Sequence, residues 1–494
     1  MFLGIDVGTS SVKALLLDED DAIVAEASAP LQSSRPRPLW SEQDPEAWCQ
    51  ATDVAVAALR GRTPRGLSGL RGVGLSGQMH GATLLDDGGH SLRPAILWND
   101  GRSAAQCETL ERAVPKTREI TGNLAMPGFT APKLLWVREH EPEVFGRVAR
   151  VLLPKDHVRL RLTGEAATDL SDASGTLWLD VARRDWSDAM LEACGLERRH
   201  MPSLHEGPEV TGRLRAEVAN AWGCERVPVV AGAGDNAAGA VGVGVFEPGR
   251  AFLSLGTSGV LFAAGDRFQP DPERAVHAFC HALPGRWHQM AVLLSASSCL
   301  TWISRATGAR DEAALLAEVA ERDRPSERLL FLPYLSGERT PHNDPQATGV
   351  FAGLDHDTDR AALGRAVLEG VAFAFADADA VLGDAGAAAE RVVAIGGGAR
   401  SRLWLRILAS VLGRPLVRLR GGEVGPALGA ARLARLGVTG LSADEVCREP
   451  ELEETVEPEP ALAAHYAERL PRFRGLYRAL QSVPDAQPSD SKEV

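Results

Sequence analysis

The stretch Phe2–Leu17, FLGIDVGTSSVKALLL, is the most informative segment of this chain. It holds two apolar segments, which we expect to be strands, joined by a Gly-Thr-Ser turn that begins at Gly8. The same design returns in the second half as Ala251–Ala264, AFLSLGTSGVLFAA. A tight turn of this kind presents backbone N–H groups and hydroxyl groups, which can bind phosphate oxygens. Two facing copies would hold one polyphosphate from both sides of a cleft.

The two copies differ two residues before the glycine. The first copy has Asp6 there, and the second has Ser254. A carboxylate beside a polyphosphate points to Mg²⁺, which uses few protein carboxylates and keeps several waters. We therefore expect Asp6 on the metal side of the site. The alternative is that Asp6 only caps the turn that follows its strand.

Length, charge and composition restrict the class of protein. A chain of 494 residues is too long for one core, so two large domains are expected. The formal net charge of −13 argues against a nucleic-acid surface, which needs a basic patch. The seven cysteines form no Cys-x-x-Cys pair, which fits a reducing compartment and argues against a disulfide framework or a zinc site. No leader and no apolar run of about 20 residues is evident, so we expect a cytoplasmic protein without a membrane partner.

Strands alternate with helices along the chain, which predicts an α/β fold. The opening pattern predicts an antiparallel meander over 2–6, 12–17 and 23–29, and then a helix over about 44–59 that begins at Asp44-Pro45-Glu46. Three later strands end in polar or glycine-rich loops, where open α/β sheets place their ligands. These strands are Arg71–Leu75, Val227–Ala231 and Val392–Ile395.

The domain boundary is expected near residue 246, because Phe246-Glu247-Pro248-Gly249 interrupts the pattern. This predicts an N-terminal domain over 1–246 and a second domain over 247–440. An acidic connector and a terminal helix are expected over 441–480. The tail 481–494 is rich in Pro, Ser and Asp, which is typical of disorder.

The strand Val227–Ala231 stops at Gly232-Ala233-Gly234-Asp235-Asn236, and an Ala/Gly-rich helix is expected over 237–244. Transfer of a phosphoryl group to an alcohol needs a carboxylate that orients the hydroxyl and accepts its proton. Asp235 is the candidate for this base, because the glycines before it permit close approach of a ligand. The alternative is that Asp235 only caps the helix.

Several long motifs together resemble the FGGY family of carbohydrate kinases. Two family signatures are found in Gly128–Val137 and Gly349–Gly370, and the resemblance extends to about residue 437. Further matching stretches are Ser76–Ala82, Pro94–Arg102, Gly232–Gly244 and Leu332–His342. The resemblance implies two ribonuclease H-like domains around a central cleft, the fold shared with actin, hexokinase and the heat-shock chaperone ATPases.

Within the family, the match is to kinases that act on pentuloses. It implies that ATP and D-xylulose give ADP and D-xylulose 5-phosphate, with Mg²⁺ as cofactor. Family members are often dimers, which makes a homodimer an expectation. A kinase for another ketose or polyol (ribulose, arabinitol, glycerol or gluconate) is the first alternative, although the loop Gln78–Gly81 disfavours glycerol, whose kinases usually have Arg-Glu there. The second alternative is an actin-like ATPase that phosphorylates no sugar.

The resemblance also assigns the sugar site. It implies that Asp235 is the general base and that Asp6 holds Mg²⁺ directly or through water. The implied sugar contacts are Met79, His80, Asn99, Asp100, Asp235 and Asn236. His80 could instead be a core histidine, and Asn99-Asp100-Gly101 could be only a turn. His277, Cys280 and His281 lack a second ligand pair, so they are expected to pack in the core or line the cleft.

The implied nucleotide contacts come from three segments. They are Thr9, Ser10, Lys13, Gly256, Thr257, Gly396, Gly397, Gly398 and Ser401. Lys13 could instead be a solvated lysine on a strand, and Gly396–Gly398 could be an ordinary strand-to-helix turn. A small-residue helix from Gly425 to Ala431 is expected either to line the same pocket or only to pack against other helices.

Overall fold

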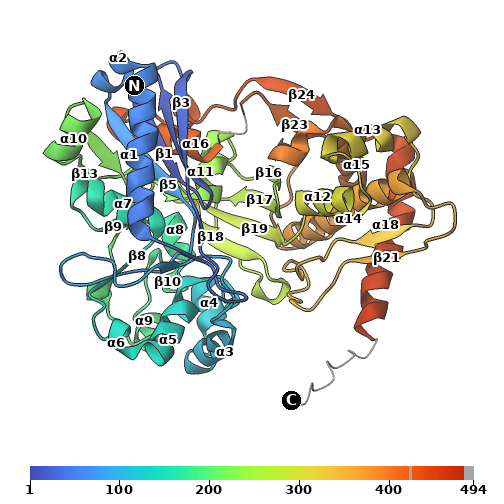
Figure 1. The fold of residues 1–494 in the computed structure, drawn as a ribbon, viewed down its shortest axis with the longest axis horizontal. Helices are drawn as coiled ribbons and strands as arrows, with labels where there is room; N and C mark the ends of the chain where they lie inside the picture. Colours follow the sequence, from blue (N-terminus) through green and yellow to red (C-terminus); the bar gives the residue numbers. More distant parts are fainter. Residues whose placement is uncertain (422–424, 483–494) are drawn as a thin grey trace.

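The computed structural model describes residues 1–421 and 425–482 (Figure 1). Two seven-stranded mixed sheets form the centres of two α/β lobes, one from each half of the chain. The first sheet runs β13-β14-β5-β1-β2-β3, with β15 paired to β5. The second runs β18-β19-β17-β16-β22-β23-β24. The expected α/β class with a duplicated architecture is therefore confirmed.

The opening meander is present as predicted. Its strands are β1 (Phe2–Val7), β2 (Ser11–Leu17) and β3 (Ile23–Pro30), paired antiparallel. Strand β5 (Gly72–Gly77) lies parallel to β1, and β14 (Pro228–Val230) and β15 (Ala233–Gly234) lie parallel to β5. The carboxyl ends of these parallel strands meet at one edge of the sheet, which is where open α/β sheets bind ligands.

The second sheet repeats this plan. Strands β16 (Arg250–Leu255) and β17 (Gly259–Gly265) form the hairpin that carries the second Gly-Thr-Ser turn. Strand β22 (Arg391–Ile395) lies parallel to β16, just as β5 lies parallel to β1. The internal repeat seen in the sequence is therefore a structural repeat.

The helices that matter for the site begin close to their predicted positions. Helix α1 (Pro45–Arg62) is capped by Asp44, whose side chain accepts a hydrogen bond from the backbone N–H of Glu46. Helix α11 spans Asp235–Gly242, so it begins at Asp235, two residues earlier than expected. Helix α15 (Arg402–Leu412) begins after Ser401, and α18 (Pro460–Gln481) contacts α15.

Helix α16 (Gly425–Thr439) belongs to the second half of the chain but packs on β1, β5 and α11. Glycines allow the close approach. A Cβ at Gly4 would lie 1.9 Å from the carbonyl oxygen of Ala427, and one at Gly429 would lie 1.8 Å from that of Ala238. Packing is thus an observed role of this helix. Because α16 packs on elements of the first half, the two halves of the chain are not separate in space. The division into two domains at residue 246 stays a prediction.

The remaining elements complete the two lobes. The strands are β4 (Glu42–Gln43), β6 (Thr83–Leu85), β7 (Ala95–Ile96), β8 (Arg150–Leu152), β9 (Ala167–Asp169), β10 (Leu179–Asp180), β11 (Asp185–Trp186), β12 (Ser203–His205), β13 (Val210–Arg213), β18 (His277–Cys280), β19 (Trp287–Leu293), β20 (Leu330–Leu332), β21 (Val350–Ala352), β23 (Leu416–Leu419) and β24 (Leu452–Val456). The helices are α2 (Pro64–Ser68), α3 (Ala104–Ala113), α4 (Thr117–Thr121), α5 (Thr130–His140), α6 (Pro142–Phe145), α7 (Pro154–Thr163), α8 (Leu170–Ser174), α9 (Asp188–Ala193), α10 (Ala216–Trp222), α12 (Ser297–Ala306), α13 (Glu312–Arg322), α14 (Arg360–Asp384) and α17 (Ala443–Val446), with short 3-10 turns at Arg198–His200, Pro272–Arg274 and Gly397–Arg400.

Among the helices of residues 1–421 and 425–482, none has the length and apolar character that a bilayer crossing requires. The predicted tail falls almost entirely outside the described residues. Gln481 ends α18 and Ser482 is its C-cap, so the expectation of disorder concerns 483–494, which lie beyond the described part of the chain.

Candidate active site

Asp6 lies near the end of β1, where two neighbouring strands supply its surroundings. The parallel pairing with β5 places Ser76 opposite Asp6, and the Ser76 hydroxyl donates to Asp6 Oδ1 at 3.1 Å. The antiparallel pairing with β2 places Lys13 on its other side. Burial raises the pKa of Asp6, while Ser76 and the charge of Lys13 act against that shift. No backbone N–H of the described residues bonds to this carboxylate, so the turn-capping role is not what the structure shows.

Asp235 is the first residue of α11, and Gly234 holds the N-cap position. Its Oδ1 accepts hydrogen bonds from the backbone N–H of Asn236 at 2.7 Å and from Asn236 Nδ2 at 3.0 Å. Within the described part of the chain, Oδ2 has no hydrogen-bond donor. Burial, followed by the negative charge of Asp6, raises the pKa of Asp235 to about 7. The two carboxylates therefore share one electrostatic site.

The first Gly-Thr-Ser turn is held from behind by a hydrogen-bond network. The hydroxyl of Thr9 donates to Gln78 Oε1 at 2.9 Å and accepts from Trp98 Nε1 at 3.0 Å. Gln43 Nε2 donates to the carbonyl of Thr9 at 2.7 Å. The Thr9 side chain is thus engaged within the protein, and Ser10 is the exposed hydroxyl of the turn. A phosphate contact by either residue stays a prediction.

Lys13 is exposed on β2. Its charge is close enough to Asp6 to oppose the rise in the pKa of that carboxyl that burial causes. An amine at this position can reach a ligand held at the end of β1, since lysine is a compact charge on a flexible stem. Its contact with the phosphates stays a prediction.

The second turn meets the start of helix α12. The backbone N–H of Ser297 donates to the carbonyl of Gly256 at 2.9 Å, and the N–H of Ala296 donates to that of Thr257 at 3.0 Å. Ser298 Oγ also donates to the Thr257 carbonyl, at 2.8 Å. The turn is therefore held by the start of α12, and its place matches that of the first turn in the other lobe.

The glycine loop after β22 packs against the end of β16. Gly396 has a φ of +87°, and a Cβ there would lie 2.9 Å from the carbonyl of Leu255. A Cβ at Gly398 would lie 2.8 Å from Ser297 Oγ, whereas one at Gly397 would meet nothing within 4 Å. The loop thus lies beside the second turn with an open face at Gly397. A nucleotide contact by this loop stays a prediction.

Ser401 has a structural role that the sequence did not assign to it. Its Oγ caps α15 by accepting a hydrogen bond from the backbone N–H of Trp404 at 3.3 Å. Caps of this kind satisfy an N–H that has no partner inside the helix. A nucleotide contact by Ser401 stays a prediction.

Met79 and His80 follow β5 at the same edge of the sheet as Asp6. Met79 is buried, and a Cβ at Gly234 would lie 3.0 Å from its sulfur. His80 has a left-handed φ of +69°. Its carbonyl accepts from Lys133 Nζ at 2.8 Å and from the Thr130 hydroxyl at 3.2 Å. The two donors hold His80 in a backbone conformation that non-glycine residues rarely adopt.

The tautomer of His80 follows from its neighbour. Its Nδ1 lies 2.7 Å from the carbonyl oxygen of Gly175, which can only accept, so Nδ1 carries the proton. Burial, and next the charge of Lys133, lower the pKa of His80 to about 3. The ring is therefore neutral, and its Nε2 offers a lone pair. A sugar hydroxyl that donates a hydrogen bond fits this atom.

Asp100 is fully engaged inside the protein. Its carboxylate makes a two-point ion pair with Arg102, at 2.8 and 2.7 Å, and accepts from the backbone N–H of Ser41 at 2.6 Å. Asn99 beside it is exposed. These bonds favour a supporting role for Asp100, and direct sugar contacts by Asp100 and Asn99 stay predictions.

Several residues around the site escaped the sequence analysis. Ser76 and Gln78 stand in the loop that was singled out, but only the register between β1 and β5 shows that they support Asp6 and Thr9. Gln43 and Lys133 come from distant segments; no local pattern marks Gln43, and the signature Gly128–Val137 contains Lys133 without showing that it contacts His80. Their roles depend on tertiary contacts.

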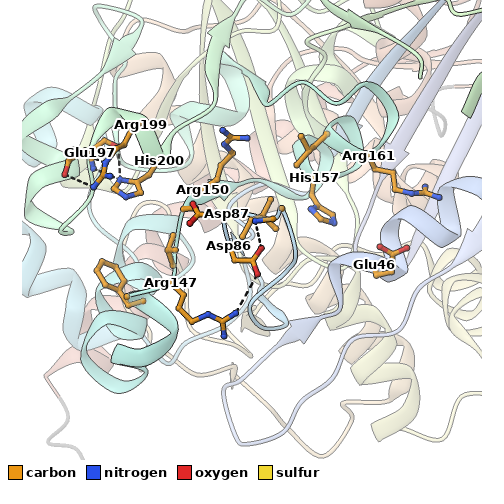
Figure 2. A pocket seen from close by; sticks show the side chains of 18 of the residues that line it. Glu46, Asp86, Asp87, Arg147, Arg150, His157, Arg161, Glu197, Arg199 and His200 are labelled. Atoms are coloured by element: carbon orange, nitrogen blue, oxygen red, sulfur yellow. Dashed lines mark hydrogen bonds and ion pairs between the residues drawn. The ribbon is translucent and has the colours of Figure 1, made fainter. Parts of the chain in front are cut away.

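A charged pocket of about 1280 Å³ lies outside this site, and none of the expected site residues lines it. Figure 2 shows Asp86, Arg147 and Arg150 on one side of it and His157 and Arg161 of α7 on another. Two of its lining residues, Glu46 and His157, have potential metal-ligand atoms that lie, with that of the buried Cys49, within 4.8 Å of one another. His277, Cys280 and His281 are buried in the core, as expected.

Comparisons with known proteins agree with this geometry. The N-terminal domain model of the FGGY family of carbohydrate kinases matches residues 1–242, and the C-terminal domain model matches 251–437. A xylulose kinase from Escherichia coli (strain K12) is 56% identical over 481 residues, covering 97% of this chain and 99% of that protein. One from Klebsiella pneumoniae is 55% identical, covering 98% of this chain and all of that protein. The crystal structure of a "xyloylose kinase" from Brucella ovis superposes with a TM-score of 0.95 at 51% identity, covering 98% of this chain and 100% of that one. The two lobes, their paired turns and these matches lead to one conclusion: the chain belongs to the FGGY family of carbohydrate kinases.

Proposed function

We propose that the protein transfers the terminal phosphoryl group of ATP to the primary hydroxyl of D-xylulose, giving ADP and D-xylulose 5-phosphate. The relatives from Escherichia coli and Klebsiella pneumoniae are xylulose kinases, and this chain matches them over nearly their whole length. The single observation that carries the chemistry is the carboxyl of Asp235, whose pKa is raised to about 7 beside Asp6.

Asp235 is the general base. A base works best when its pKa lies near the working pH, because it is then both available and strong enough to take the proton. Asn236 occupies Oδ1 through two hydrogen bonds, which leaves Oδ2 for the acceptor hydroxyl. The proton moves to Oδ2 as the sugar oxygen forms its bond to phosphorus and the bond to the leaving ADP breaks.

The residues present suit Mg²⁺. Burial raises the pKa of both Asp6 and Asp235, so the protein alone does not fully stabilise their ionised forms, and a cation would supply the missing compensation. Ser76 bonds to Oδ1 of Asp6, and Oδ2 is left for a metal or for one of its waters. When bound, Mg²⁺ neutralises charge on the phosphates. Asp6 would hold it directly or through water.

The nucleotide would lie between the lobes. The backbone N–H groups of the two Gly-Thr-Ser turns suit the phosphates, and the open face at Gly397 suits the nucleoside. Closure of the two lobes would exclude water and so limit hydrolysis of ATP.

On the sugar side, Met79 and neutral His80 offer an apolar wall and a hydrogen-bond acceptor. This pair does not by itself separate D-xylulose from ribulose or arabinitol. The test is release of ADP with a panel of pentuloses and polyols. D-xylulose is expected to give the highest kcat/KM. ATP hydrolysis that is indifferent to every sugar would instead support an actin-like ATPase.

A further inference from the structure

Arg339 lies in the segment that follows β20, in the second half of the chain. Its Nη1 is 3.2 Å from Nε2 of His277. The Nδ1 of His277 lies 3.1 Å from Oδ1 of Asn123, whose Nδ2 donates to the carbonyl of Ala278 at 3.1 Å. Because Oδ1 of Asn123 accepts, His277 carries its proton on Nδ1. Its Nε2 is therefore an acceptor, and Arg339 donates one hydrogen bond to it.

The positive charge of Arg339 has little compensation. No ion pair within 4.0 Å joins it to a carboxylate of residues 1–421 and 425–482. The carboxyl of Glu338 next to it accepts instead from the backbone N–H groups of Leu294 at 2.9 Å and of Arg339 at 2.7 Å. Burial raises the pKa of Glu338 to about 8, so this carboxyl is largely neutral near pH 7.

A guanidinium has five N–H donors, and this one uses a single donor on the described residues. Arg339 is only partly exposed, and burial lowers its pKa. A charge in such a place is costly unless it is paired. The cost is explained if a ligand supplies the missing acceptors.

A row of rings connects Arg339 to the sugar side of the site. The ring of His277 packs edge-on against Phe129 with centroids 5.3 Å apart, and Phe129 packs edge-on against His80 at 4.9 Å. The charge of Arg339 contributes to the lowered pKa of both His277 and His80. The charge of Arg339 thus acts on the imidazole of His80, to which His277 and Phe129 connect it.

We propose that Arg339 is a sugar-binding residue that donates hydrogen bonds to the same ketose oxygen whose proton His80 Nε2 accepts. The two side chains are complementary: His80 Nε2 can only accept, and Arg339 can only donate. A hydroxyl group satisfies both at once. This oxygen differs from the one that is phosphorylated, because Asp235 serves that hydroxyl. The inference rests on the proposed function, and it makes sugar binding depend on both halves of the chain.

The test is Arg339→Met, assayed with D-xylulose and with analogues that each lack one oxygen. The expected result is a KM for D-xylulose raised at least about tenfold with the KM for ATP within about twofold, since a hydrogen bond from a charged donor carries this much binding. The wild type should prefer D-xylulose to each analogue. The variant should lose this preference against one analogue only, the one that lacks the oxygen that Arg339 binds. Arg339→Lys keeps the positive charge but loses the planar set of guanidinium donors. Its KM for D-xylulose is expected to lie between those of the wild type and of Arg339→Met.

Arg184→Met is the matched control, because Arg184 is paired with Glu206 at 2.7 Å and lies over the Trp287 ring. It is expected to leave the KM for D-xylulose unchanged. Calorimetric binding of D-xylulose to Arg339→Met, with folding checked by its melting curve, gives a readout that does not need turnover. An unchanged sugar KM and Kd in a folded Arg339→Met protein would overturn the inference. A wild-type protein that does not phosphorylate D-xylulose would instead overturn the proposed function.

Discussion

Asp6 and Asp235 share one electrostatic site, in which burial, and next the negative charge of Asp6, raises the pKa of Asp235 to about 7. Asp6 comes from β1 and Asp235 from the first turn of α11, more than 200 residues later in the chain. Like charges that share a site disfavour ionisation of one partner. This pair connects the fold, the electrostatics and the chemistry of the site, and it gives the first prediction.

The rate should depend on the protonation of Asp235. Below about pH 7 the base is protonated, so kcat/KM for D-xylulose is expected to fall tenfold for each pH unit. In Asp6→Asn the neighbouring charge is gone, and the pKa of Asp235 in the ligand-free protein is expected to drop. A carbon-13 NMR titration of the aspartate carboxyls measures that pKa without turnover. An unchanged titration in Asp6→Asn would show that the two groups are independent.

Ionised Asp235 should also reduce the stability of the ligand-free protein. Its folded pKa lies above the unfolded value, so the folded state binds the extra proton, and stability is lost as pH rises from about 4 to about 7. Asp235→Asn is therefore expected to be more stable than the wild type above this window, by on the order of 1–3 kcal/mol. Urea unfolding on both sides of the window measures the difference. A gain that is the same at both pH values would contradict the electrostatic cause.

His80 should bind sugar as a neutral acceptor. Because burial lowers its pKa to about 3, His80 is expected to contribute no titration to the sugar KM between about pH 5 and 7. Nitrogen-15 NMR of the ring should show the proton on Nδ1, the atom bonded to Gly175. His80→Phe is expected to raise the KM for the sugar and leave that for ATP unchanged. A protonated ring near neutral pH would rule out the acceptor role.

The network behind the first turn should affect nucleotide binding. Gln78→Ala removes the acceptor of the Thr9 hydroxyl and is expected to raise the KM for ATP about two- to tenfold, the effect of one hydrogen bond. Gln106→Ala is the control, because Gln106 bonds to Glu139 outside the site. Equal effects of the two variants on the KM for ATP would contradict the role of the network.

Packing of α16 on the first sheet should be intolerant of side chains. A Cβ at Gly4 would lie 1.9 Å from the carbonyl of Ala427, so Gly4→Ala is expected to destabilise by at least about 3 kcal/mol or to prevent folding. Gly61→Ala is the control, since a Cβ there meets nothing within 4 Å, and in helix α1 it should stabilise by up to about 1 kcal/mol. Thermal melting compares the two, and similar melting temperatures would contradict this packing.

Local patterns were sufficient for much of the fold. Strand and turn patterns predicted the meander β1–β3, and capping chemistry predicted that α1 follows Asp44. The repeated Gly-Thr-Ser turn agreed with the duplication that the family resemblance implied, and each copy lies in one of the two sheets. Each of these features depends on residues close together in the chain, which a sequence displays directly.

Tertiary placement could not be predicted in the same way. The crossing of α16 onto β1 depends on glycines in both halves of the chain. The left-handed backbone of His80 is held by Lys133, and the orientation of Arg339 is set by His277 and Asn123. These contacts join distant segments. The hydrogen bond from the backbone N–H of Ser41 to Asp100 is likewise invisible in a pattern that reads as a turn.

The most direct measurement is the single-turnover rate of phosphoryl transfer from ATP to D-xylulose in Asp235→Asn, with the Kd of the sugar measured on the same sample. Asn keeps the shape of the side chain and removes the base. The account predicts a Kd within about threefold of the wild type and a rate lower by about 10²–10⁴, the contribution of a general base. A rate within about tenfold of the wild type at saturating sugar would contradict it.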